Sequence, residues 1–320
     1  MPKLKDIAEI SGYSISTISK VLRNKGKISE TTKEKILKIV EKINYKYNSN
    51  NIHKQNDASF ICLSVPDIEN PFYSTIAKII EQLLERKGFI MVLCSTINSL
   101  TNQKTLMNQI KKGQIRGIII CPVAENDKID KSLSIPIVLL DKKVNDQKFS
   151  YVMTDNFNAA KQAVLYLIHK GKKKIVCIKN KHEELRLEGY LKALEIKNLP
   201  INNDLIIDGD FTFHGGYSAM NELLSRKIPF DAVFADNDIA AFGVIERLRL
   251  EGISVPGDVS VLGFDNIWLT EIYTPNLSTV SQPINKMCEV AAEILFKKFE
   301  DPNYKSQILI PSKLIIRNSA

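Results

Sequence analysis

Apolar residues in the first 45 positions recur at the three- and four-residue spacing of amphipathic helices. The first such stretch stops before Gly12, a residue that readily takes the positive φ found at the end of a helix. Ser14 is placed to cap a second helix, over residues 15–22. A third helix is predicted to begin at Ser29 or Thr31, since either side chain can cap it. The pattern predicts a small all-α head of three helices.

After a polar segment, apolar runs of strand length alternate with longer stretches of helical periodicity. The clearest predicted strands cover residues 60–65, 89–94, 117–121, 174–178, 232–235 and 259–264. The predicted helices cover residues 71–86, 101–112, 156–170, 185–198, 215–225 and 239–251. This alternation predicts an α/β body of doubly wound parallel sheets with helices on both faces. Because the pattern occurs twice, we expect two lobes.

The positive charge of the chain is concentrated at its N-terminus. Residues 1–56 contain twelve Lys or Arg and five Asp or Glu, a net charge of +7, whereas the remaining residues carry only +1 of the total of +8. Lys and Arg clusters favour polyanions, because each phosphate that they neutralise releases counterions. The distribution predicts a small nucleic-acid-binding head on a nearly neutral body.

The five cysteines are widely spaced and mostly lie within apolar runs, and no Cys-x-x-Cys pair occurs. This is typical of small buried side chains in a reducing compartment. The four histidines show no metal-ligand spacing with the cysteines, so we expect no structural metal and no cofactor. No signal-peptide pattern or apolar span of membrane length occurs, and we expect a cytoplasmic protein without a membrane partner.

Three residues in the head have the spacing of a helix-turn-helix. Ala8 allows the first two helices to approach, Gly12 permits the tight turn, and Ile18 anchors the second helix. In this motif the second helix enters the major groove of DNA with its N-terminal residues facing the base edges. The alternative is a three-helix adaptor with a solvated basic face, which the spacing alone does not exclude.

The outward positions of the second predicted helix are the candidates for reading bases. Ile15 can meet a thymine methyl group, Ser16 can bond to several bases, and Lys20 can reach guanine or a phosphate. The other polar and basic residues are better placed for the DNA backbone. The predicted DNA contacts of the head are Lys3, Lys5, Ser14, Ile15, Ser16, Thr17, Ser19, Lys20 and Asn24.

The segment Leu-Lys-Asp-Ile-Ala-Glu-Ile-Ser-Gly-Tyr-Ser-Ile-Ser-Thr-Ile-Ser-Lys-Val-Leu, residues 4–22, resembles the head of the lac/gal repressor family of bacterial transcription regulators. The resemblance places Ile15, Ser16 and Lys20 at the base-reading positions of that family. It also implies that the linker folds on DNA as a hinge helix that wedges a leucine into the minor groove.

The linker departs from that family pattern. Lys54 falls where the leucine belongs, Tyr47 where a proline is usual, and Asn51 where an alanine is usual. Either Ile52 takes over the wedge, or this protein bends DNA little. Ile52 and Lys54 complete the predicted DNA contacts.

Oxygen-bearing side chains follow the predicted strands of the body, where ligands bind in open α/β sheets. They occur at residues 66–73, 141, 155–156, 236–238 and 265–266. Together with aromatic side chains, they suit a cleft for a polyhydroxylated ring. The same residue types cap helices, and for Asn70, Asp155 and Asp238 capping is at least as good an interpretation.

Motifs throughout the body are also similar to the lac/gal family, among them residues 66–72, 186–190, 235–238 and 255–265. The resemblance covers essentially the whole chain and implies a periplasmic-binding-protein-like body. The effector-binding residues that it implies are Phe72, Tyr73, Asp141, Arg186, Phe211, Asn237 and Asp265. Trp268 has two interpretations, because it can stack on a sugar face or pack in the core or between the lobes.

Lys179 and Lys181 stand where the family usually has a Gly-Gly-Pro sequence. Two lysines near the mouth of a cleft favour an anionic effector, such as a sugar acid or a sugar phosphate. The alternative is a plain solvated turn.

These features predict a sequence-specific DNA-binding repressor of a carbohydrate-use operon, controlled by a sugar or a sugar derivative. A homodimer on a palindromic operator is expected, because one head reads only a short half-site. A transport-type sugar-binding protein would share the body but not the head, and a corepressor-dependent catabolite regulator would use the same parts. No Gly-x-Ser-x-Gly, Walker A or His-Glu-x-x-His motif occurs, and we expect no enzymatic activity.

The predicted domain limits are residues 1–45 for the helix-turn-helix head, 46–57 for the linker and 58–320 for the effector-binding and dimerisation body. Within the body, we expect lobe 1 at about 58–150 plus about 283–305, and lobe 2 at about 151–278 plus about 306–320.

Overall fold

The computed structural model describes residues 4–22, 28–43, 59–96, 99, 101–102, 105–106, 108, 115–124, 129 and 135–320. The chain divides into two compact units, Met1–Asp57 and Ala58–Ala320. The division falls at the predicted end of the linker. Each unit is described by itself.

The head contains three helices, α1 (Leu4–Ser11), α2 (Ile15–Leu22) and α3 (Glu30–Lys42). Their apolar faces meet in a small core around the fully buried Ile7, Ile18 and Ile36. Ile10 has the same helical spacing as the apolar residues of α1 but is largely exposed. The helical periodicity of the sequence therefore predicted most of this core.

The chain reversals in the head follow local backbone chemistry. Gly12 has a φ of +72° just after α1, as expected for a residue that ends a helix. The Ser14 hydroxyl accepts a hydrogen bond from the Thr17 amide at 3.2 Å and caps α2. Of the two predicted caps for α3, the structure uses Ser29, whose hydroxyl accepts from the Thr32 amide. These caps satisfy amides that lack partners inside the helices.

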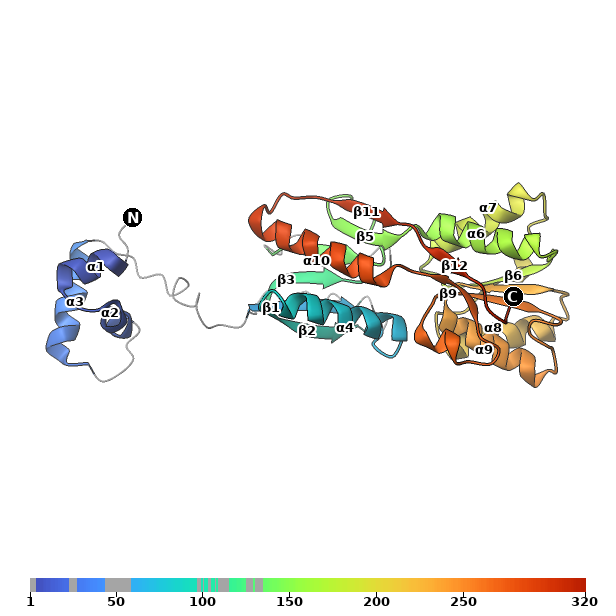
Figure 1. Ribbon diagram of the computed structural model, residues 1–320, viewed down its shortest axis with the longest axis horizontal. Helices are drawn as coiled ribbons and strands as arrows, with labels where there is room; N and C mark the ends of the chain where they lie inside the picture. Colours follow the sequence, from blue (N-terminus) through green and yellow to red (C-terminus); the bar gives the residue numbers. More distant parts are fainter. Residues whose placement is uncertain are drawn as a thin grey trace. The chain divides into compact units, whose positions relative to one another are not determined.

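The body contains two six-stranded sheets (Figure 1). The strands of lobe 1 are β1 (Ser59–Val65), β2 (Phe89–Ser95), β3 (Ile115–Ile120), β4 (Ile137–Leu140), β5 (Ser150–Thr154) and β11 (Gln307–Ile310). The strands of lobe 2 are β6 (Ile175–Lys179), β7 (Ile206–Asp208), β8 (Ala232–Ala235), β9 (Ser260–Asp265), β10 (Ser278–Ser281) and β12 (Lys313–Ile315). The orders are β2-β1-β3-β4-β5-β11 and β7-β6-β8-β9-β10-β12. Apart from the antiparallel β10–β12 pair, neighbouring strands are parallel, and the predicted doubly wound fold is confirmed.

Helices pack on these sheets as the alternating pattern predicted (Figure 1). They are α4 (Pro71–Glu85) and α10 (Ile284–Glu300) in lobe 1, and α6 (Asn156–His169), α7 (Glu184–Ile196), α8 (Phe213–Ser225) and α9 (Asp238–Leu250) in lobe 2. Short 3-10 helices cover Asn203–Leu205 and Trp268–Glu271. The helix expected over 101–112 lies largely outside the described residues.

Alternating side chains within the strands of lobe 2 bury two separate cores. On β6, Val176 and Ile178 point to the core formed with α8 and α9. Their neighbours Ile175 and Cys177 point to the core formed with α6 and α7. Because successive side chains of a strand face opposite sides, a strand covered on both faces is apolar throughout. This explains the uninterrupted apolar runs of the sequence.

The chain crosses between the lobes three times, after β5, after β10 and after β11. The lobe limits predicted near residues 150 and 306 are therefore a few residues too early. Residues 151–154 pair with β4 and β11, and residues 307–310 pair with β5, so both segments belong to lobe 1. Strand pairing, which acts across the sequence, sets these limits.

Candidate functional site

A polar cavity lies where the carboxyl ends of strands from both lobes meet. It is lined by Asp67, Asn70, Phe72, Tyr73, Asp141, Lys142, Glu183, Arg186, Phe211, Thr212, Asn237 and Asp265. Its volume is about 30 Å³, whereas a single water needs roughly 10–15 Å³ on the same scale. The two lobes therefore lie close together around the cavity.

The first wall of the cavity is the N-terminal turn of α4. Asn70 caps this helix through Oδ1, which accepts from the Phe72 amide at 3.0 Å. The cap orients Phe72 and Tyr73, whose rings meet edge to face at 5.1 Å between centroids. The Tyr73 hydroxyl donates to Asp141 Oδ2 at 3.3 Å. Burial raises the pKa of Tyr73, so its hydroxyl remains a donor.

Two charged residues follow β4 and face the cavity. Asp141 has a φ of +74° and is buried, and its Oδ1 atom has no hydrogen-bond partner. The ammonium of Lys142 donates to the Val123 carbonyl at 3.3 Å and to the His182 carbonyl at 3.0 Å. It also lies 3.6 Å from Glu183 Oε2. Since Val123 is in lobe 1 and Glu183 is in lobe 2, Lys142 connects the lobes.

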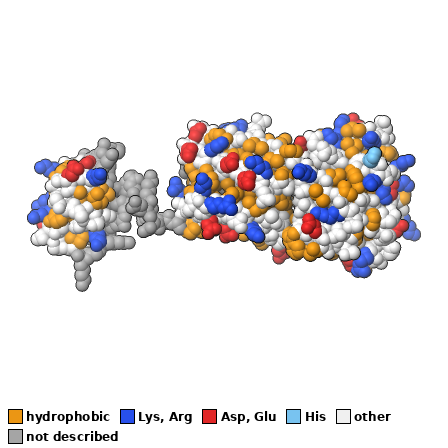
Figure 2. All heavy atoms as spheres, viewed as in Figure 1, with side chains coloured by type: hydrophobic (Ala, Val, Ile, Leu, Met, Phe, Trp, Pro, Cys, Tyr) orange, Lys and Arg blue, Asp and Glu red, His pale blue; other side chains and the backbone are white. Residues whose placement is uncertain are grey.

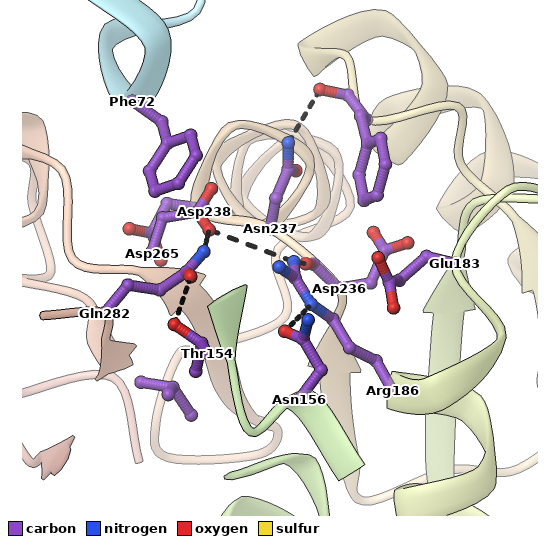
Figure 3. Close-up of polar contacts among 12 residues, drawn as sticks. Phe72, Thr154, Asn156, Glu183, Arg186, Asp236, Asn237, Asp238, Asp265 and Gln282 are labelled. Carbon is purple, nitrogen blue, oxygen red and sulfur yellow. Dashed lines mark hydrogen bonds and ion pairs between the residues drawn. The ribbon is translucent and has the colours of Figure 1, made fainter. Parts of the chain in front are cut away.

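Arg186, on α7, is the central cation of the cavity (Figure 3). Its Nε donates to Asn156 Oδ1 at 3.0 Å, and its Nη1 donates to the Asp236 carbonyl oxygen. The same Nη1 lies 3.8 Å from Asp265 Oδ1. The guanidinium covers the Phe264 ring at 3.7 Å from its centroid, which is a favourable cation–π geometry. Packing and hydrogen bonds together fix the orientation of the planar guanidinium group of Arg186.

Asn237 serves both the fold and the cavity. Its Oδ1 accepts from the Ala240 amide at 2.8 Å and caps α9, while its Nδ2 donates to the Phe211 carbonyl at 2.8 Å. The prediction that Asp238 caps this helix is therefore wrong. Asp238 is fully buried and instead accepts from the Ile267 amide at 2.9 Å and the Thr279 hydroxyl at 2.5 Å. These hydrogen bonds connect the start of α9 to β10 and to the loop that follows β9.

Asp265 is connected to two of the three lobe crossings (Figure 3). Its Oδ1 accepts from Gln282 Nε2 at 2.8 Å, and Gln282 Oε1 accepts from the Thr154 hydroxyl at 2.6 Å. Thr154 ends β5, and Gln282 follows β10. All three side chains are buried. A change at the cavity therefore reaches the segments that join the lobes.

The carboxyl groups around Arg186 resist ionisation. Burial raises the pKa of Asp236 to about 8, although Arg186 opposes the shift. Burial also raises the pKa of Asp265 to about 7, against the effects of Arg186 and Gln282. The pKa of Asp141 is raised for the same reason. In a cavity with so little room for water, each further negative charge is costly.

The second helix of the head presents the predicted base-reading side chains. Ile15, Ser16 and Lys20 are exposed on α2, while Ile18 and Val21 are buried against the other helices. Ser14, Thr17, Ser19 and Lys5 also reach the surface of the head at least in part. Figure 2 shows both basic and acidic side chains on the visible face of the head and on that of the body. The predicted contacts Lys3, Asn24, Ile52 and Lys54 lie outside the described residues.

Comparisons with known proteins agree with this arrangement. The family "Bacterial regulatory proteins, lacI family" matches residues 3–48, and "Periplasmic binding protein-like domain" matches residues 164–320. The HTH-type transcriptional regulator MalR of Clostridium butyricum is 32% identical over 330 residues, covering 99% of this chain and 98% of MalR. The chain belongs to the LacI family of bacterial regulatory proteins.

Two solved structures of regulators share the fold. A complex of the transcriptional regulator CelR with cellobiose is similar with a TM-score of 0.76 and 26% identity over 100% of both chains. A LacI family transcriptional regulator from Enterococcus faecium with bound ribose has a TM-score of 0.72 and 30% identity, covering 82% of this chain and 98% of that chain. This LacI-family chain is a transcription regulator with a DNA-binding helix-turn-helix head.

For this LacI-family member, the structure brings together seven of the eight predicted effector contacts. Trp268 is the exception, because it does not line the cavity and is 62% exposed. Its large exposed area contradicts packing in the core, and its position outside the cavity gives no support to stacking on a ligand there. Lys179 pairs with Asp208, Lys181 is exposed, and neither lines the cavity. The solvated turn is therefore the correct interpretation of these lysines, and they give no support to an anionic effector.

The sequence did not predict Lys142, Glu183, Thr212 or Gln282 as residues of the site. Lys142 directly follows Asp141 at the end of a strand, and this position was the available signal. Glu183 and Gln282 lie in polar loops that resemble many surface loops.

In the described part of the chain, each helix is too short or too polar to span a bilayer.

We expect Gln282→Leu to weaken communication between the cavity and the lobe crossings. The substitution leaves the Thr154 hydroxyl and Asp265 Oδ1 without their buried partner, which costs about 1–3 kcal/mol per group. The effect of an effector on DNA affinity should shrink by at least about 5-fold. Gel retardation with and without effector measures this ratio. Gln82→Leu, at an exposed glutamine of α4, is the control, and an unchanged ratio in Gln282→Leu contradicts the proposed connection.

The raised pKa values also predict how stability depends on pH. Folded Asp236, with a pKa of about 8, holds a proton at pH values where the unfolded side chain, with an ordinary value of 3.8, has lost it. Its contribution to stability is therefore fully present below the unfolded pKa and is lost as the pH rises through about 8. We expect the Tm of the protein to fall by several degrees between about pH 5.5 and 8.5, since about 1 kcal/mol shifts Tm by roughly 2–4 °C.

Asp236→Asn should flatten this pH dependence, because asparagine retains an acceptor for the Asn180 amide without a charge. Thermal unfolding of both proteins at several pH values provides the test. Asp204→Asn, at an exposed position, should retain the wild-type slope. Equal slopes for Asp236→Asn and the wild type would show that Asp236 ionises normally in the fold.

Proposed function

We propose that this protein represses transcription and that a small polyhydroxylated effector, a sugar or sugar derivative, controls its DNA binding from the cavity between the lobes. The observation that carries the proposal is the set formed by Arg186, Asp265 and Asp141, with Phe72 and Tyr73 beside it. A planar cation and carboxylates supply paired donors and acceptors for hydroxyl groups, and aromatic rings cover the apolar faces of a sugar. The cellobiose and ribose complexes of similar regulators support a sugar.

The narrow cavity indicates how the effector acts on the fold. Residues of both lobes line the cavity, so an effector that binds there contacts both lobes and changes the contacts between them. Lys142 and Glu183 hold the lobes together, and Gln282 connects the cavity to two crossings. Effector binding therefore shifts the lobe arrangement, and by linkage the effector binds DNA-bound and free protein with different affinities.

We further propose a cytoplasmic homodimer that binds a palindromic operator, because one α2 helix reads only a short half-site. The exposed Trp268 and Ile272 provide apolar surface for contact between two bodies, at 62% and 66% exposure. Sedimentation at micromolar concentration should give the mass of a dimer, and a monomer would contradict this part. We infer that the cavity binds its ligand without catalysis, because the family consists of transcription regulators.

The test of the proposed function is gel retardation with the upstream region of the protein's own gene. At low salt, the full chain should retard this duplex more strongly than an unrelated duplex of equal length. A sugar that raises the Tm should then change the retardation, by weakening it if it is an inducer or strengthening it if it is a corepressor. If the protein retards no duplex at low salt, with or without sugars, the proposal that it acts as a repressor is wrong.

A further inference from the structure

Among the described residues that line the cavity, acidic groups outnumber basic ones. They are four carboxyl groups, Asp67, Asp141, Glu183 and Asp265, and two cations, Lys142 and Arg186. Asp236 lies directly behind Arg186, whose Nη1 donates to its backbone carbonyl. Because burial raises the pKa of Asp141 and Asp265, a ligand that brings positive charge would stabilise the ionised forms of these carboxyl groups.

Both cations already have protein partners. Arg186 donates to Asn156 and to the Asp236 carbonyl, and its plane is held against Phe264. Lys142 gives hydrogen bonds to two carbonyl oxygens, Val123 and His182, in different lobes. Neither side chain is free to follow an anionic ligand, and each compensates only part of the surrounding charge.

Two lining carboxylates have unused capacity to accept hydrogen bonds. Asp141 is only 6% exposed, yet its Oδ1 has no partner, and its Oδ2 has a long contact of 3.3 Å with the Tyr73 hydroxyl. Glu183 precedes α7 but makes no capping bond with its side chain, and its ion pair with Lys142 is 3.6 Å long. A buried acceptor without a donor costs about 1–3 kcal/mol, so a ligand that supplies donors is favoured.

We propose that the effector carries a protonated amino group, as an amino sugar does, and that Asp141 of lobe 1 and Glu183 of lobe 2 bind this group. The inference rests on the proposed function of the cavity and specifies the chemical class of its ligand. An ammonium supplies three N–H donors together with the missing positive charge. A neutral hydroxyl supplies one donor and no charge, and an anion adds to the imbalance.

A metal ion is the other way to supply positive charge, and the geometry does not suit it. Among the residues that the structure describes, no group of three or more His, Cys, Asp or Glu side chains is arranged to hold a metal. Burial raises the pKa of Asp141 and Asp265 although Arg186 lies nearby, so their charged forms are only partly compensated by the protein.

The experiment measures binding of matched sugars to the full-length protein by calorimetry. Glucosamine, galactosamine and mannosamine are compared with their parent hexoses, their N-acetyl forms and the 6-phosphates of the hexoses. At least one hexosamine should bind at least about 10-fold more tightly than its three counterparts, which corresponds to about 1.4 kcal/mol. In Asp141→Asn, this preference should fall to within about 2-fold. The control, Asp204→Asn, makes the same change of charge at an exposed position and should retain the preference.

Three results would overturn the amine proposal: a neutral hexose or a phosphate that binds as tightly as its hexosamine, no binding of any hexosamine, or an unchanged preference in Asp141→Asn. Thermal unfolding of both variants shows whether they remain folded. These failures are distinguishable from failure of the proposed function. If a neutral sugar binds and changes the retardation of DNA, the proposed regulatory function is supported and only the proposal of an amino group in the effector is contradicted.

Discussion

Asp265→Asn is expected to reduce effector affinity by about 30- to 1000-fold while DNA binding without effector stays within about 2-fold of wild type. The carboxylate lies 3.8 Å from the buried Arg186 and is placed to accept from two ligand hydroxyls. Loss of one member of a buried charge pair costs about 2–4 kcal/mol in binding. Calorimetry with the best-binding sugar measures the loss, and gel retardation shows whether the operator stays occupied when that sugar is added.

Asparagine is the most informative substitution at this position. It has the size of aspartate, tolerates the φ of +117° and keeps an oxygen that can accept from Gln282. The fold should therefore survive, and only the charge is removed. Asp204→Asn is the control for an exposed aspartate. Wild-type effector affinity in a folded Asp265→Asn protein would exclude Asp265 from the binding site.

Lys20→Ala is expected to produce the largest loss of operator affinity among single substitutions in the head. Lys20 is exposed in the last turn of α2, the helix proposed to enter the major groove. A base contact is worth about 1–3 kcal/mol, and a dimer loses it twice, so the Kd should rise at least about 30-fold. Gel retardation at several salt concentrations measures both the affinity and its salt dependence.

The salt dependence distinguishes two roles for Lys20. If it contacts a phosphate, affinity falls equally for all sequences and the salt slope decreases by about one per head. If it contacts guanine, discrimination at one base pair is lost. Lys38→Ala, at an exposed position of α3, removes the same charge away from α2 and serves as the control. Equal losses in the two variants would mean that only the net charge of the head matters.

Local chemistry made much of the fold predictable. The core residues Ile7, Ile18 and Ile36 recur at helical spacing, and Gly12 and Ser14 mark the helix ends within the same short segment. Similarly, apolar runs of five to seven residues identified strands because both faces of each sheet are covered. These signals act between residues close in sequence, so they can be recognised without coordinates.

The cavity was predictable in outline for a different reason. Ligand-binding residues follow strands in parallel sheets, and this placed Asp141 and Asp265 near one another before any contact was known. Arg186 was implied by the resemblance to the lac/gal repressor family. The sequence did not predict which of these side chains remain available to hydrogen-bond a ligand. The Asn237 side chain, for example, caps α9 and donates to the Phe211 carbonyl, and both interactions depend on the fold.

The remaining features arise from contacts between residues far apart in the chain. Lys142 forms an ion pair with Glu183, and Thr154 donates a hydrogen bond to Gln282, which lies 128 residues further along the chain. Both contacts form because the three crossings bring the two lobes together. Burial is likewise a property of the packed molecule, which is why neither the exposure of Trp268 nor the complete burial of Asp238 followed from the sequence. Sequence periodicity thus specified the head, the strands and the edge of the sheets where the cavity lies. The arrangement of the lobes determined which carboxylates are buried without a partner, and with it the charge of the effector that we propose.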